Sequence, residues 1–284
     1  MTILEAIVLG IVQGLTEFLP VSSSAHLIIV PWLLGWESPG LAFDAALHLG
    51  TLGAVLIYFW RDILAMLVTL PRALRHPGDV LKSRDPRDTM PRLSLLIAIG
   101  TIPGLIIGYF GQSVIDAAYH QPGGPPDRII IAIAMALAGL ALFMLVGERL
   151  ARHTRVLSDL RLPDGLAIGL SQAAALIPGV SRSGATITTG LFRDLTREDA
   201  ARFSFLLGVP IIAAAGLKGV YDTFSAGLPQ DQLVIFIIGI VTSGVAGLLA
   251  ISGLLRYLQR STFRIFIVYR LALALALVLL TLVK

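Results

Sequence analysis

Six long apolar segments constrain the fold of this 284-residue chain more than any other feature. A helix that crosses a bilayer needs ~20 mostly apolar residues, and each of these segments reaches or approaches that length. Only 14% of the residues are charged, whereas soluble proteins carry about 25%. We therefore exclude a soluble enzyme, a nucleic-acid-binding module and a disordered chain, and expect one all-α membrane domain over residues 1–284. The six segments are 44–60, 92–110, 128–147, 200–220, 232–255 and 264–283.

Four further apolar segments are too short or too interrupted to cross a bilayer. The shortest covers nine residues, about 14 Å of helix, and prolines interrupt or bound all four. Short segments broken by proline and glycine at matching places are typical of re-entrant hairpins. We therefore predict six transmembrane helices plus two re-entrant helical hairpins. The short segments are 3–19, 24–35, 164–177 and 184–192, and the prolines are Pro20, Pro31, Pro163 and Pro178.

The basic residues predict how the chain is oriented. Seventeen of the 22 Lys and Arg residues lie in or beside segments 61–92, 149–161, 193–202 and 256–264, whereas 111–127 and 221–231 contain none. Basic residues favour the cytoplasmic side, so we expect the first group inside and the second outside. Both termini then lie outside, with hairpin 3–35 entering from outside and hairpin 164–192 from the cytoplasm. The first residues carry no basic cluster, so we expect no secretory signal, and the lack of cysteine excludes disulfides and thiolate chemistry.

The two halves of the chain resemble each other. A shift of 159 residues superimposes Gly10 on Gly169, Gln13 on Gln172, and Val21-Ser22 on Val180-Ser181. Ser24 then falls on Ser183 and Ile28 on Ile187, and each half has the order short, short, long, long, long. Three crossings per half is an odd number, so we predict inverted repeats over about 1–147 and 160–284, with a shared site near the bilayer midplane. The alternative is chance similarity between helices rich in small residues.

Gln13 and Glu17 are candidate metal ligands. They lie four residues apart, so a helix presents both on one face. A carboxylate inside a membrane is costly and usually functional, and carboxylate and amide oxygens suit Mg²⁺ or Ca²⁺. The alternative is a Glu17 that reaches the interface or pairs with an arginine.

Two polar stretches are candidate phosphate sites. Ser22, Ser23 and Ser24 follow Pro20, where a helix would begin. Serine is a preferred N-cap, so one hydroxyl has a structural explanation, but three exceed what a cap needs. Helix N-termini bind anions and arginine binds phosphate in a bidentate manner. We therefore expect these serines to form a phosphate pocket together with Ser181, Arg182 and Ser183.

Ser23 and His26 are a candidate nucleophile and base. They lie three residues apart, about one helical turn, and a hydroxyl needs an adjacent base to attack. The structural alternative is a histidine that only packs. His48 is a competing candidate without a serine neighbour, and His76, His120 and His153 fall in expected loops.

At these residues the chain resembles the bacitracin-resistance type undecaprenyl-diphosphate phosphatases. The resemblance rests on QGLTEFLPVSSSAHL at 13–27 and PGVSRSGAT at 178–186, in the family's order, and covers essentially the whole chain. It implies hydrolysis of undecaprenyl diphosphate to the monophosphate carrier used in cell-wall synthesis, in the bacterial inner membrane. It also implies roles for individual residues: Glu17 and Gln13 on a divalent cation, Ser23 as nucleophile, His26 as base or acid, and Arg182, Ser181, Ser183 and Thr186 on phosphate.

A transporter or flippase of a polyprenyl phosphate or another organic anion is the alternative, because inverted repeats are typical of transporters. A transporter needs Arg182 but has little use for a nucleophile beside a base. We expect the site to face the outer, periplasmic side, because the first hairpin enters from there. The sequence leaves a homodimer open.

Overall fold

The described part of the computed structural model, residues 1–38, 40–119, 125–227 and 230–283, is helical, with a single isolated β-bridge and no strand element. Three short 3₁₀ helices accompany the α-helices: Pro86–Asp88, Leu157–Asp159 and Gln172–Leu176. The α-helices are α1 (Ile3–Phe18), α2 (Ser23–Leu34), α3 (Leu41–Tyr58), α4 (Trp60–Arg75), α5 (Pro77–Lys82), α6 (Thr89–Tyr119), α7 (Asp127–Leu150), α8 (Leu162–Ser171), α9 (Arg182–Phe192), α10 (Arg197–Ala226), α11 (Gln230–Leu258) and α12 (Arg264–Val283).

Six of the described helices, α3, α6, α7, α10, α11 and α12, are long and apolar enough to cross a membrane. These are the six predicted spans, so the prediction of an all-α chain with six candidate spans is confirmed. Several helices extend beyond the apolar windows that identified them. In α10, for example, Glu198 and Asp199 occupy the first turn, where acidic side chains are favourable because the N-terminal end of a helix carries partial positive charge.

The four short apolar segments also form helices. The first two become α1 and α2, and the second two become α8 with its 3₁₀ extension and α9. The order short, short, long, long, long is therefore present in each half, with α4 and α5 as additions to the first. The structure places α4 in segment 61–92, where the sequence was interpreted only by its charge. Helix α4 exposes Leu64, Leu67 and Val68 on one side. This i, i+3, i+4 spacing is typical of an amphipathic helix.

Close helix crossings hold the bundle together. Helices α1 and α3 both pack along α11, and α8 packs on α6. At Gly10 of α1, an added Cβ would lie 2.8 Å from the carbonyl oxygen of Gly239, and at Gly169 of α8 it would lie 2.8 Å from the carbonyl carbon of Gly100. Small residues at these crossings let helix backbones approach closely, as in many membrane helix pairs.

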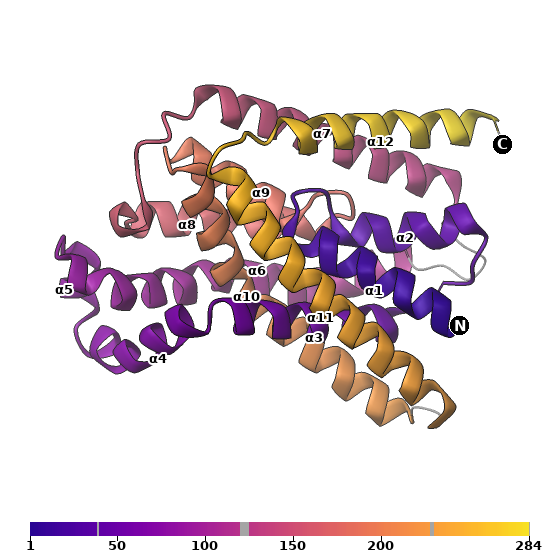
Figure 1. Cartoon of the computed structure of the whole chain (residues 1–284), viewed down its shortest axis with the longest axis horizontal. Helices are drawn as coiled ribbons and strands as arrows, with labels where there is room; N and C mark the ends of the chain where they lie inside the picture. Colours follow the sequence, from indigo (N-terminus) through magenta and orange to yellow (C-terminus); the bar gives the residue numbers. More distant parts are fainter. Residues whose placement is uncertain (39, 120–124, 228–229, 284) are drawn as a thin grey trace.

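The basic connections gather at one end of the molecule. In Figure 1, α4, α5 and the α7–α8 connection lie at the left end, and both termini lie at the right. Hydrogen bonds join the basic connections to one another: Arg155 donates to the carbonyl of Arg193, and Arg92 to that of Ser158. The basic segments that the orientation rule assigned to one side therefore share one end of the bundle.

Candidate active site

The two polar motifs, distant in sequence, contact each other in the middle of the bundle. The backbone N–H of Gly179 donates to Ser22 Oγ at 3.2 Å, and Ser183 Oγ donates to the carbonyl of Leu19 at 3.1 Å. Gly179 has a φ of +100°, a conformation that favours glycine. The turn after α1 and the turn before α9 are thereby held against each other.

Both turns end in serine N-caps, and the one at Ser22 falls in the serine run where the sequence predicted a cap. Ser22 Oγ accepts from the backbone N–H of Ala25 at 3.4 Å, and Ser181 Oγ accepts from that of Gly184 at 3.0 Å. The N-terminal ends of α2 and α9 therefore lie at the site. The first N–H groups of a helix have no partner within the helix, and together with the helix dipole they favour anions.

Glu17 is the centre of the site and is 7% exposed. Its Oε2 accepts from Ser23 Oγ at 2.8 Å and from Gln13 Nε2 at 3.3 Å, while Oε1 accepts from Arg182 Nη2 at 3.3 Å. His48 Nε2 lies 3.8 Å from Oε2. The structure thus brings Gln13, Glu17, Ser23 and Arg182 together, and adds His48, which the sequence had ranked below His26 for lack of a serine neighbour.

The donor set for a cation is small. Gln13 is fully buried, and its Oε1 has no hydrogen-bond partner, so an amide oxygen is available beside the Glu17 carboxylate. Within the described ranges, no group of three or more His, Cys, Asp or Glu side chains gathers. Mg²⁺ in phosphate-handling sites is usually held by one or two carboxylates plus substrate oxygens. The residues therefore fit a cation that a bound phosphate helps to hold.

A hydrogen bond to Ser204 holds the Arg182 side chain in place. Its Nη1 donates to the carbonyl of Ser204 at 3.0 Å, and its buried Nε has no partner. Thr186 Oγ1 bonds to the carbonyl of Arg182 at 2.8 Å and to Ser204 Oγ at 2.6 Å. Thr186 is thus engaged in supporting Arg182, and its predicted phosphate contact stays a prediction. Ser181 and Ser183 share a hydrogen bond at 3.0 Å, and Ser22 and Ser24 share one at 3.3 Å.

His26 has partners other than the expected one. Its Nδ1 lies 2.7 Å from the carbonyl oxygen of Ser22, and its Nε2 lies 2.6 Å from the hydroxyl of Tyr269. Ser23 instead donates to Glu17. The pairing of Ser23 with His26 therefore stays a prediction, while the structure places a carboxylate beside the serine.

The sequence interpretation missed two residues of α12, Tyr269 and Arg270. Arg270 is fully buried and donates to the carbonyls of Pro20 at 3.2 Å and Gly179 at 2.7 Å, one in each motif. A signal was present, because Arg270 is the single charged residue in the apolar run 265–283. A charge within a spanning segment usually marks function or a buried partner. For Tyr269 the sequence offers no comparable signal.

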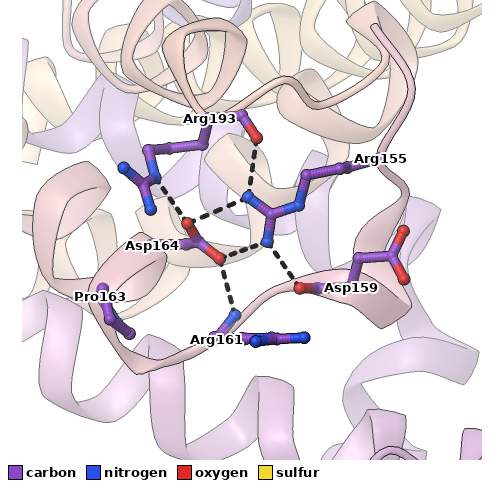
Figure 2. Close-up of a pocket in the computed structure, with 6 residues that line it drawn as sticks. All are labelled: Arg155, Asp159, Arg161, Pro163, Asp164 and Arg193. Carbon is purple, nitrogen blue, oxygen red and sulfur yellow. Dashed lines mark hydrogen bonds and ion pairs between the residues drawn. The ribbon is translucent and has the colours of Figure 1, made fainter.

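A second polar cluster lies apart from the motif residues, at the start of α8 (Figure 2). Asp164 accepts from Arg155 Nη2 at 2.6 Å, from Arg193 Nε at 2.6 Å and from the backbone N–H of Arg161 at 2.9 Å. These contacts raise the pKa of the Arg155 guanidinium above its usual value. The pocket around them is lined by Arg155, Asp159, Arg161, Pro163, Asp164 and Arg193. Because Asp164, Arg155 and Arg193 are already paired with one another, the cluster is suited to holding the loops together.

His76 follows α4 and is exposed, and His153 lies in the connection after α7, as expected for loop residues. His120 lies outside the described residues.

Comparison with known proteins gives one consistent result. The family model described as bacitracin resistance protein BacA matches residues 6–276. A protein of Thermomicrobium roseum named undecaprenyl-diphosphatase is 49% identical over 279 residues, 98% of each chain. A protein of Moorella thermoacetica with the same name is 45% identical over 275 residues, 96% of each chain. One of Desulforudis audaxviator, also so named, is 44% identical over 280 residues, 99% of this chain and 98% of the relative.

Proposed function

The chain belongs to the bacitracin resistance protein BacA family, and from that membership we propose that it is a multi-pass membrane hydrolase that converts undecaprenyl diphosphate to undecaprenyl phosphate and inorganic phosphate. The observation that carries the proposal is the contact array of Ser23, Glu17 and Arg182 at two helix N-termini. Phosphoryl transfer depends mainly on positioning the reacting groups and on neutralising charge. This array supplies a hydroxyl and a carboxylate for the first task and the guanidinium of Arg182 for the second.

Ser23 is the proposed nucleophile. Its Oγ would attack the terminal phosphorus, the bond to the bridging oxygen would break, and undecaprenyl phosphate would leave. Because Ser23 Oγ donates to Glu17 at 2.8 Å, Glu17 is the nearest acceptor for the serine proton. Arg182 and the N–H groups of α2 and α9 would stabilise the phosphate oxygens. Water then attacks the phosphoserine, free phosphate leaves and Ser23 regains its proton, with His26 as the acid–base group for this half.

We propose Glu17 and Gln13 as ligands of a divalent cation, Mg²⁺ or Ca²⁺, completed by substrate oxygens. The unpartnered Oε1 of Gln13 beside the Glu17 carboxylate supports the proposal. A bound cation would supply positive charge against the diphosphate.

We propose that α1–α2 and α8–α9 are re-entrant hairpins of two inverted repeats, about 1–147 and 160–284. The packing supports this: α1 packs on α11, and α8, its counterpart, packs on α6, the counterpart of α11. The superimposed pairs also behave alike. Gly10 and Gly169 sit at these two crossings, and Ser22 and Ser181 both cap helices.

We propose a bacterial inner-membrane location, with the basic end of the bundle in the cytoplasm and the site open to the periplasmic side. The gathering of basic connections at the end opposite both termini supports this orientation (Figure 1).

The test is release of inorganic phosphate from undecaprenyl diphosphate by the purified protein in detergent. We expect multiple turnovers, loss of activity with EDTA and recovery with Mg²⁺ or Ca²⁺. If no phosphate is released with or without added Mg²⁺ or Ca²⁺, hydrolysis is contradicted and transport of the intact lipid is favoured. Release that EDTA leaves unchanged would contradict the cation proposal alone.

A further inference from the structure

Both ring nitrogens of His26 are held by hydrogen bonds. Nδ1 lies 2.7 Å from the carbonyl oxygen of Ser22, and Nε2 lies 2.6 Å from the hydroxyl oxygen of Tyr269. The two rings are also nearly parallel, with an interplanar angle of 11° and centroids 5.8 Å apart. Tyr269 therefore makes a directional contact with a residue of the first motif, 243 positions earlier in the chain.

These contacts define one tautomer of the neutral ring. A carbonyl oxygen can only accept, so Nδ1 must carry the hydrogen that lies toward Ser22. Neutral imidazole has one N–H, which leaves Nε2 as an acceptor, and the Tyr269 hydroxyl then donates to it. The basic nitrogen of His26 thus faces Tyr269.

The position of Tyr269 is fixed by its neighbour in the chain. The guanidinium of Arg270 is fully buried and donates to the carbonyls of Pro20 and Gly179, as well as to that of Leu137 in α7 at 3.1 Å. These contacts tie α12 to both motif turns. Since residue 269 adjoins the anchored position, its ring is held in place relative to the first motif, although Tyr269 itself is 44% exposed.

We propose that Tyr269 is a positioning residue: its hydroxyl holds Nε2, the basic nitrogen of His26, in place, while the Ser22 carbonyl fixes the Nδ1–H. A phenol suits this task because its oxygen both donates and accepts. When His26 takes a proton on Nε2, the Tyr269 hydroxyl can rotate and accept from the new N–H. The ring then keeps its place in both protonation states. The expected effect on turnover rests on the proposed function, whereas the hydrogen bonds and the tautomer of His26 do not depend on that function.

The first test reads the tautomer directly. Protein labelled with ¹⁵N-histidine is studied by long-range ¹H–¹⁵N NMR in detergent, and His26→Gln assigns the His26 signals by their loss. We expect wild type to show a protonated Nδ1 and a hydrogen-bonded acceptor Nε2. In Tyr269→Phe, which keeps the stacked ring, the Nε2 signal should move toward that of an unbonded acceptor, while Nδ1 stays protonated because the Ser22 carbonyl is unchanged. Unchanged His26 signals in Tyr269→Phe would overturn the proposal.

The second test separates positioning from a role in packing alone. Tyr269→Phe should lower kcat about tenfold, the size expected for one lost hydrogen bond. KM should stay within about twofold of wild type, because Tyr269 is proposed to contact His26 and not the substrate. Tyr257→Phe is the matched control, since the structure records a ring contact of Tyr257 with Phe266, and it should leave kcat unchanged. Wild-type kcat in Tyr269→Phe would contradict positioning. If wild type releases no phosphate, the proposed function fails, while the NMR result still decides the Tyr269–His26 contact.

Discussion

Glu17 and Asp164 are both buried carboxylates paired with arginine, yet their surroundings differ. Asp164 is 1% exposed and accepts from two arginine side chains and a backbone N–H, with two contacts as short as 2.6 Å. Glu17 receives one arginine contact at 3.3 Å. Beside it, Gln13 Oε1 and Arg182 Nε have no hydrogen-bond partner.

The two clusters therefore differ in how fully their polar groups are hydrogen-bonded, and this difference distinguishes a structural ion-pair cluster from a binding site. A buried polar group without a partner costs about 1–3 kcal/mol, and a ligand that bonds to it can recover that free energy. The Asp164 cluster has used its hydrogen-bonding capacity on the loops it joins. The Glu17 cluster keeps acceptor and donor capacity at two helix N-termini. We expect phosphate to bind there and not at the Asp164 cluster.

The largest effect is expected for Glu17→Gln. The substitution keeps the size of the side chain but removes the charge that orients Ser23 and faces Arg182. Turnover should fall by about 10²–10³-fold, as when a preorganised polar group is lost from an active site. The measurement is phosphate release at saturating substrate, with the thermal unfolding temperature recorded for the same sample.

Asp164→Asn is the matched control and should behave in the opposite way. Asparagine keeps one acceptor oxygen but removes the negative charge that pairs with Arg155 and Arg193. Since both arginines are partly exposed, we expect a loss of about 2–3 kcal/mol in unfolding free energy. Turnover per folded molecule should match wild type. A large loss of turnover in Asp164→Asn at full folding, together with an active Glu17→Gln, would reverse the assignment of structural cluster and binding site.

A smaller effect is expected for Gly208→Ala. An added Cβ at Gly208 would lie 2.5 Å from Cζ of Arg182 and 2.8 Å from its Nη2, so the guanidinium must move while the helix backbone stays. Turnover should fall about 10–100-fold, because small displacements of positioning groups are costly, with little change in unfolding temperature. Gly139→Ala, where an added Cβ meets no atom within 4 Å, should retain wild-type turnover. Equal turnover in the two variants would contradict a positional role for Arg182.

The sequence predicts the parts of this molecule that depend on local patterns. Apolar length predicts the six candidate spans, and serine before a helix predicts a cap in the run 22–24, which Ser22 supplies. The partner of Ser23 was not predictable in this way, because it depends on the turn at Ser22, where φ is +79°. Ser23 and His26 both lie in α2, but this turn brings Ser23 to Glu17 of α1. Tyr269 was beyond reach because its contact joins residues 243 positions apart.

Binding of a diphosphate tests the central claim most directly. The ligand is a polyprenyl diphosphate analogue whose bridging oxygen is replaced by methylene, so that it cannot be hydrolysed, and calorimetry gives its Kd. We expect Arg182→Gln to weaken binding at least about tenfold, because a charged hydrogen-bond donor is lost, whereas Arg193→Gln should bind like wild type. Wild-type affinity in Arg182→Gln, or a comparable loss in Arg193→Gln, would contradict this expectation.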